Sequence, residues 1–179
     1  MIRRTALKTC FLVTLAMLAT GCVRPAPQKD VPDPIGAFRL GHVVVVADQA
    51  QAGPLSRKAD PDDWEAVLSA ALKDRFQNYQ GAGLYHIAVK VDGYILAPPG
   101  VPVVAAPKSV AVLGVSIWDD AAGRKLNEKP KTITVIESLS GKSLVSSGLT
   151  MTSEEQMQDI AIRAAAQIQV WLEGNKDWF

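Results

Sequence analysis

The sequence predicts an α+β protein: a two-layer sandwich in which two helices cover one face of a mostly antiparallel sheet of four to five strands. Three observations lead to this prediction. Several short segments rich in valine and isoleucine have the spacing of strands. Two longer segments place apolar residues three or four positions apart, as helices that pack on a sheet do. The roughly 140 residues that carry these patterns suit one domain, with the order strand, helix, strands, helix.

The first predicted strand covers residues 41–48. It contains four consecutive valines, Val43 to Val46, without a polar interruption. A strand with this composition is typically buried on both faces. We therefore expect it to lie centrally in the sheet.

The first helix is predicted to begin after Asp60, which can cap it, with Pro61 at the first helical position. Acidic residues in the first turn suit the positive end of the helix dipole. We expect Gly81 and Gly83 to end the helix. The predicted buried stripe is Trp64, Val67, Leu68, Ala71, Leu72 and Phe76.

Two strands are predicted at 84–96 and 110–118, because apolar and polar residues alternate along them. The second strand ends in the turn 119–123. A hairpin is expected next, with strands at 132–138 and 144–147 joined across Ser140-Gly141-Lys142. The order along the chain favours consecutive antiparallel pairing.

The last helix is predicted to begin near Ser153. A capping box can form between Thr152 and Glu155, or between Ser153 and Gln156. Gly174 suits the C-terminal cap. The predicted buried stripe is Met157, Ile160, Ala161, Ala164, Ile168, Trp171 and Leu172.

The N-terminus combines a basic segment, an apolar segment at 11–18 and small residues that lead to Cys22. The apolar segment is far shorter than the roughly 20 residues that a membrane-spanning helix needs. The segment resembles a bacterial lipoprotein signal, which implies cleavage before Cys22 and acylation of its thiol. The alternative is an ordinary secretory signal cleaved after the Ala-x-Ala-like residues 19–21.

The predicted organisation therefore has three parts: a signal peptide at 1–21, a lipidated cysteine with a proline-rich tether at 22–37, and one periplasmic domain at 38–179. The tether composition favours extended, solvated conformations. In enterobacterial lipoproteins an aspartate after the cysteine favours the inner membrane. Val23 stands there in this chain, so the resemblance implies the outer membrane, with the inner membrane as the alternative.

Charge and cysteine content exclude some classes. Without Arg3, Arg4 and Lys8 of the signal, the 19 basic residues become 16 against 18 acidic ones, a net charge of −2. This balance argues against nucleic-acid binding, which needs cations to neutralise phosphates. Cys10 would be removed with the signal and Cys22 acylated, so no disulfide is expected.

The layout of the domain resembles that of small bacterial lipoproteins. The shared features are a valine-rich first strand, a helix, a strand that ends in Asp-Asp-Ala-Ala-Gly-Arg, a strand-turn-strand around Ser-Gly-Lys and a terminal amphipathic helix. The resemblance covers about residues 38–173. It extends to transport auxiliary lipoproteins, to lipoprotein activators of penicillin-binding proteins and, most closely, to uncharacterised lipoprotein families. None of these features is a motif that indicates a specific function.

No residue pattern indicates catalysis, a cofactor or a metal, so we do not expect an enzyme. His42 and His86 are the two histidines, and each lies in or beside a predicted strand, where a structural role is commoner than a catalytic one. Asp119, Asp120 and Glu128 lack the spacing of a calcium loop, and paired aspartates are ordinary in turns.

The segment 97–107 is apolar, uncharged and too rich in proline for a central strand. Long loops of this kind are often functional. The segment either folds back over its own sheet edge or docks on a partner or a lipid surface. The candidate partner-binding residues are Val101, Val103 and Val104.

Two functions follow from these observations. The favoured one is a non-enzymatic, lipid-anchored envelope lipoprotein that binds or positions a protein partner in the periplasm. The alternative is a periplasmic carrier with a pocket for a small ligand or lipid between the sheet and the helices. The apolar residues at core spacings look sufficient to fill that layer, which favours the first function.

Overall fold

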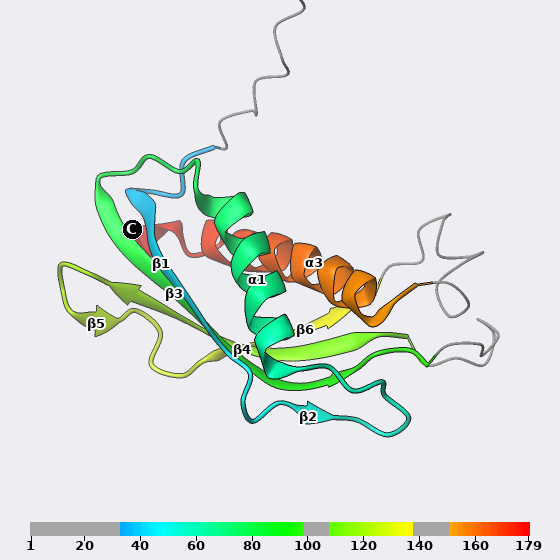
Figure 1. Ribbon diagram of the computed structural model, residues 1–179. Helices are drawn as coiled ribbons and strands as arrows, with labels where there is room; N and C mark the ends of the chain where they lie inside the picture. The colour runs from blue at the N-terminus through cyan, green and yellow to red at the C-terminus, as the bar shows by residue number, and fades with distance from the viewer. Residues whose placement is uncertain (1–32, 99–107, 138–150) are drawn as a thin grey trace, which may run out of the picture. The chain divides into compact units, whose positions relative to one another are not determined.

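The computed structural model describes residues 33–98, 108–137 and 151–179 (Figure 1). Its α+β class agrees with the prediction. The described elements form a six-stranded sheet and two helices. In chain order they are β1 (Phe38–Val46), β2 (Gln51–Ala52), α1 (Pro61–Phe76), β3 (Gly83–Ile95), β4 (Val110–Asp119), β5 (Arg124–Lys125), β6 (Lys131–Ile136), α3 (Ser153–Glu173) and the short 3₁₀ helix η1 (Lys176–Trp178).

The sheet is mixed, which corrects the expectation of consecutive antiparallel strands. β3 pairs antiparallel with β4, and β4 pairs antiparallel with β5 and β6. In contrast, β1 and β2 both run parallel to β3. The physical reason is the position of α1 between β1 and β3: a helical crossover returns the chain to the end where the first strand began. The two short strands β2 and β5 also change the predicted order.

The predicted central position of the valine-rich strand is wrong. β1 pairs with β3 on one side and with no other described strand, so it lies at an edge of the sheet. Val45 is buried, but Val44 and Val46 are exposed, so the strand is covered on one face only. Four valines satisfy the pattern of a doubly buried strand and that of a half-covered edge strand equally well.

α1 begins as expected, since the Asp60 side chain accepts a hydrogen bond from the Asp62 backbone N–H at 3.1 Å. It ends at Phe76, earlier than the predicted glycines. Gly81 instead donates its backbone N–H to the Phe38 carbonyl at 3.0 Å. A Cβ on Gly81 would overlap the carbonyl of Ala37, so glycine permits this close backbone approach.

Both helices lie on the same face of the sheet, as predicted (Figure 1). The capping box between Thr152 and Glu155 is present, and Gly174 is the C-terminal cap of α3. Trp171 is only partly buried, unlike the rest of the predicted stripe of α3. The largest fully buried side chains between the two layers include Trp64, Phe76, Leu68, Leu72, Ile87, Leu113, Ile117, Met157 and Ile160.

An aromatic cluster closes the core beside the start of β1. The Phe38 ring packs against those of Tyr85 and Phe179, with centroids 5.8 and 5.4 Å away. Gly36 adopts a φ of +51°, and a Cβ there would lie 2.6 Å from the backbone oxygen of Phe179. The segment that leads into β1 therefore packs against the residues that follow α3, and Ile35 is already buried.

Several predicted features lie outside the described residues. They are the signal peptide, Cys22 and the tether as far as residue 32, the loop residues Val101, Val103 and Val104, and the second hairpin strand at 144–147. Within the described ranges, no helix combines the length and the apolar character that crossing a membrane requires.

Candidate interaction surface on the open face of the sheet

Side chains on β1, β3 and β4 alternate between the helix-covered face and the opposite face, which we call the open face. The strand register shows which residues lie together there. Val44 is the register partner of Ala88, which in turn pairs with Ser116. The part of the open face around Val44 consists of Val44, Val46, His86, Ala88, Lys90, Ser116 and Trp118.

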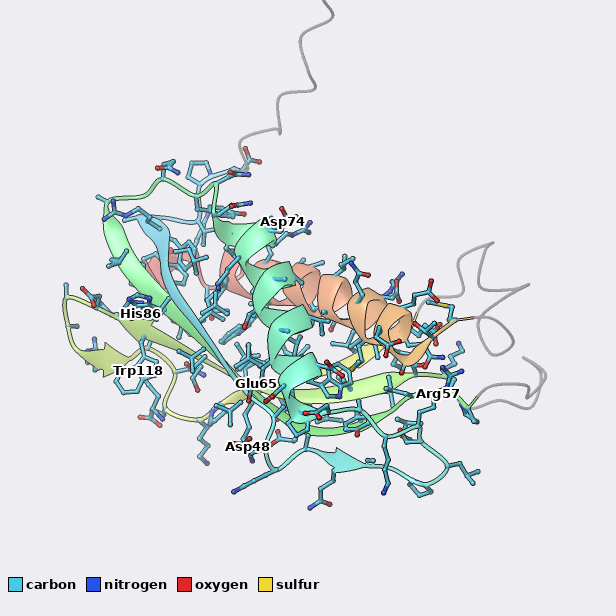
Figure 2. The ribbon with its side chains drawn as sticks, viewed as in Figure 1. Asp48, Arg57, Glu65, Asp74, His86 and Trp118 are labelled. Carbon is cyan, nitrogen blue, oxygen red and sulfur yellow. The ribbon has the colours of Figure 1, made fainter. Side chains whose placement is uncertain are left out.

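Three large apolar side chains in this part of the open face are exposed. The exposed fractions are 51% for Val44, 42% for Val46 and 41% for Trp118. Small residues, Ala88 and Ser116, stand beside Val44 in the register. Figure 2 shows Trp118 on the side of the sheet away from α1 and α3. The result is an apolar strip with an aromatic side chain at one end.

A polar cluster borders this strip beside Trp118. The His42 backbone N–H donates to His86 Nδ1 at 2.9 Å, and His86 Nε2 lies 3.0 Å from Asp120 Oδ1. Since Nδ1 accepts a hydrogen bond, the neutral ring carries its proton on Nε2 and donates it to Asp120. The two imidazoles also stack, with centroids 5.0 Å apart. Both ring nitrogens of His86 are thus engaged, as expected of a structural histidine.

The opposite end of the strip is also polar. Lys90 Nζ and Asp92 Oδ1 form an ion pair at 3.0 Å on β3. Lys90 is the register partner of Val46. Exposed ion pairs add little stability, because water screens them. Their effect here is to frame the apolar strip with charge.

The free edges of the sheet differ in how they are protected. Between β5 and β6, the Asn127 side chain pairs with the backbone of β4. Its Oδ1 accepts from the Ile117 N–H at 2.9 Å, and its Nδ2 donates to the Val115 carbonyl at 3.0 Å. Among the described residues, no comparable side chain runs along β1. Ala47, the residue after β1, donates its N–H to Glu65 Oε1 at 3.1 Å. The segment from Leu40 to Ala47 carries no Asp, Glu, Lys or Arg, the residues that commonly protect edge strands.

The turn after β4 has the ordinary chemistry expected of it. The Ala122 N–H donates to Asp119 Oδ1 at 3.0 Å, and Gly123 has a φ of +60°. In the three described ranges, no group of three or more His, Cys, Asp or Glu side chains is arranged to hold a metal ion.

The sequence did not identify Val44, Val46 and Trp118 as surface residues. Apolar residues on both sides of an alternating strand are the usual sign of burial. Only the position of β1 at the edge, and of both helices on one face, shows that these side chains remain uncovered. The available signal was the order strand, helix, strand, which is compatible with a parallel crossover.

A periplasmic carrier would need a pocket between the sheet and the helices, and core side chains occupy that layer. Trp64, Leu68 and Ile87 are fully buried between the sheet and α1. Two surface grooves of about 500 and 480 Å³ lie elsewhere, the first between β6 and α3 and the second between α1 and α3. No specific observation in the described residues therefore favours a carrier.

No protein family and no curated protein matches this chain. Several solved structures have a similar chain path. A Xanthomonas campestris protein of family DUF330 has 14% identity and a TM-score of 0.44, over 80% of this chain and 90% of that one. A hypothetical protein from Chlamydia trachomatis has 11% identity and a TM-score of 0.47, over 77% and 97%. A minor lipoprotein from Acinetobacter baumannii has 16% identity and a TM-score of 0.31, over 75% and 94%. Similarity at this level assigns neither a family nor a function.

Proposed function

We propose that this protein is a non-enzymatic, lipid-anchored lipoprotein of the bacterial envelope and that its open face holds a protein partner in the periplasm. The observation that carries the proposal is the exposure of Val44, Val46 and Trp118 on a sheet face that the two helices leave uncovered. The cysteine at position 22, after a basic and then apolar segment, supports the anchor.

The chemistry of the open face suits a protein rather than another class of partner. Protein interfaces combine an apolar centre, often with an aromatic anchor, and a polar rim. Val44, Val46 and Trp118 correspond to the apolar part, in which Trp118 is the aromatic side chain. The His86–Asp120 and Lys90–Asp92 pairs correspond to the rim. Without its signal the chain has a net charge of −2, which does not favour nucleic acid.

The anchor sets how far the domain can reach from the membrane. Eleven peptide units separate Cys22 from Asp33, the first described residue. At about 3.3–3.6 Å per residue, a fully extended chain of this length spans at most about 40 Å. The distance between a partner and the membrane surface is therefore limited to the length of the tether plus the size of the domain. Val23 after the cysteine favours the outer membrane in this proposal.

The anchor is tested by Cys22→Ser in the full chain, expressed in a bacterium and followed by membrane fractionation. A lipoprotein loses its tight membrane association with this change and incorporates no radiolabelled palmitate. If Cys22→Ser still partitions firmly with the membrane, the anchor part of the proposal is wrong.

The partner site is tested by photo-crosslinking. A photoreactive amino acid replaces Val44 in the full chain, and crosslinked products are compared with those from the same replacement at Ile162. Ile162 is the matched control, because it is 57% exposed but lies on α3, away from the open face. A distinct protein product at position 44, lost when Trp118→Asp is added, supports the site. Equal products at the two positions would contradict it.

The loop residues Val101, Val103 and Val104 remain a second candidate docking element on sequence grounds. Their replacement by serine in the full chain separates the two elements. If this variant loses the position 44 product while the fold is intact, the loop takes part in partner binding. If the product persists, the open face acts without the loop.

A further inference from the structure

We infer that the groove between β6 and α3 binds an extended, acidic segment of a partner protein, which adds as a further strand to the edge of β6 that no described strand pairs. This site is distinct from the open face, and the inference does not depend on the proposed function. The groove has a volume of about 500 Å³. β6 contributes Lys131–Thr134 to its lining, and α3 contributes Ala166, Gln167, Val170 and Trp171.

α3 presents an exposed apolar side chain beside β6. One side of α3 packs into the core through Ala164, Ile168 and Leu172, which are fully buried. Val170 faces the groove and is 67% exposed. An apolar helix residue with this exposure, beside a strand edge, has the environment that an additional strand would cover.

The backbone of β6 supplies the second part of the site. On one side, Lys131 to Ile136 pair with Val110 to Val115 of β4, and no other described strand pairs with β6. In a strand, alternate residues direct their N–H and C=O groups to opposite edges. The outer edge of β6 therefore presents backbone donors and acceptors next to an apolar groove. Strand addition uses this combination: main-chain hydrogen bonds provide affinity, and side-chain pockets provide specificity.

The charge beside the groove decides the chemistry of the bound segment. Lys129 and Lys131 stand at the start of β6, whereas Arg124 and Lys125 lie at the other end of β4, where Arg124 is the register partner of Asp119. Lys131 lines the groove itself. Among the described residues, no ion pair involves Lys131. A carboxylate on the bound segment would gain a charge-assisted contact with this ammonium group.

The occupant is therefore a segment of about five or six extended residues, matching the length of β6, with apolar side chains toward α3 and an acidic residue near Lys131. This arrangement places a strand between the edge of a sheet and a helix. A second copy of the chain fits less well, because β1, the other long edge without a described neighbour, has no acidic residue from Leu40 to Ala47.

The test measures binding of synthetic peptides to the full chain in detergent by fluorescence anisotropy. The probe is a labelled peptide with alternating valine and threonine and a glutamate at each end. Two comparison probes carry lysine in place of glutamate, or N-methyl groups on alternate backbone amides. We expect the acidic probe to bind, the basic probe to bind more weakly, and N-methylation on the pairing edge to abolish binding, because it removes the main-chain donors.

Variants locate the site. Val170→Lys should weaken the acidic probe by about tenfold or more, as expected when a central interface contact is lost. Ile162→Lys is the matched control: it has a similar exposure on the same helix but lines the groove between α1 and α3. Lys131→Glu should reverse the preference between the acidic and the basic probe. Equal effects of Val170→Lys and Ile162→Lys, or an unchanged charge preference in Lys131→Glu, would overturn the inference.

Two further outcomes assign the groove to another occupant and also overturn the inference. The first is the absence of probe binding together with concentration-dependent self-association that Val170→Lys removes, because the occupant would then be a second copy. The second is probe binding only after residues 138–150 are replaced by a glycine-serine linker. In that case the groove belongs to this chain's own segment.

Discussion

Phe179 packs edge-on against Phe38 at the start of β1, with ring centroids 5.4 Å apart and an interplanar angle of 86°. Phe179 also meets Tyr85 in the same geometry, at 4.9 Å. Edge-to-face aromatic pairs contribute about 0.5–1.5 kcal/mol beyond the area that they bury. The contact joins the residues after α3 to the strand that carries Val44 and Val46, so it supports the edge of the sheet on which the proposed partner site lies.

Phe179→Ala should therefore destabilise the fold. Phe179 is partly buried, so we expect a loss of about 1–3 kcal/mol in the free energy of unfolding, below the range for a fully buried phenylalanine. Lys176→Ala is the control, because its side chain is exposed. Urea denaturation followed by tryptophan fluorescence measures both. A change of less than about 0.5 kcal/mol for Phe179→Ala would show that the aromatic contact is not maintained in solution.

Gly81→Ala should be among the most damaging single changes, and Gly174→Ala should be nearly neutral. A Cβ on Gly81 overlaps the carbonyl of Ala37, so β1 and the segment before β3 must separate. A Cβ on Gly174 makes ordinary contacts at 3.5 Å, and its φ of −69° suits any residue. We expect about 3 kcal/mol or more for the first and less than about 0.5 kcal/mol for the second. Thermal unfolding of the two variants checks the difference, and similar melting temperatures would contradict the close approach.

Asn127→Ala should expose the edge of β4. The change removes the acceptor of the Ile117 N–H and the donor to the Val115 carbonyl. Leaving such groups without partners costs about 1–3 kcal/mol. We also expect a greater tendency to aggregate, because the sealed edge becomes available for pairing. Light scattering measures aggregation, with Glu128→Ala as the neighbouring control; equal scattering by the two variants would refute the protective role of Asn127.

Alkaline pH should destabilise the aromatic cluster. Burial raises the pKa of the Tyr85 phenol above its ordinary value, with a smaller contribution from Asp119, and burial followed by Glu173 does the same for Tyr79. A folded-state pKa above the unfolded value means that this stability is fully present below the unfolded pKa of about 10 and is lost as the pH rises through the folded pKa. Tyr85→Phe retains the ring and removes the ionisation. The fall in unfolding free energy between about pH 8 and about pH 11 should be shallower in Tyr85→Phe, and an identical slope would show that Tyr85 contributes nothing to it.

The helices and most strands could be predicted because local signals determine them. Asp60, Pro61 and the box between Thr152 and Glu155 fix where the helices begin, and their apolar stripes face the core as expected. The position of β1 could not be derived from its composition. Valine suits any half-covered pleated surface, and the pairing partner depends on contacts between residues far apart in the sequence. The end of α1 was misplaced for the same reason, since Gly81 serves a long-range backbone contact with the start of β1.

The candidate surface was less accessible to prediction than the fold. Trp118 and Val44 belong to apolar segments that read as core, and their exposure depends on which face the helices leave open. The groove beside β6 likewise could not be predicted, because Lys131 and Val170, which line it together, belong to elements far apart in sequence. In contrast, the position of His86 in a strand was apparent from the sequence, and both of its ring nitrogens form hydrogen bonds.

The most direct test of the central claim is the yield of crosslinked protein from the open face in intact cells. The photoreactive residue is placed at position 44 in the full chain, with and without Trp118→Asp, and the mature fold is checked by circular dichroism. We expect a discrete product that contains a second protein, present at position 44, absent at position 162 and strongly reduced by Trp118→Asp. No discrete product at position 44, or one that Trp118→Asp leaves unchanged, would contradict the claim that the open face holds a protein partner.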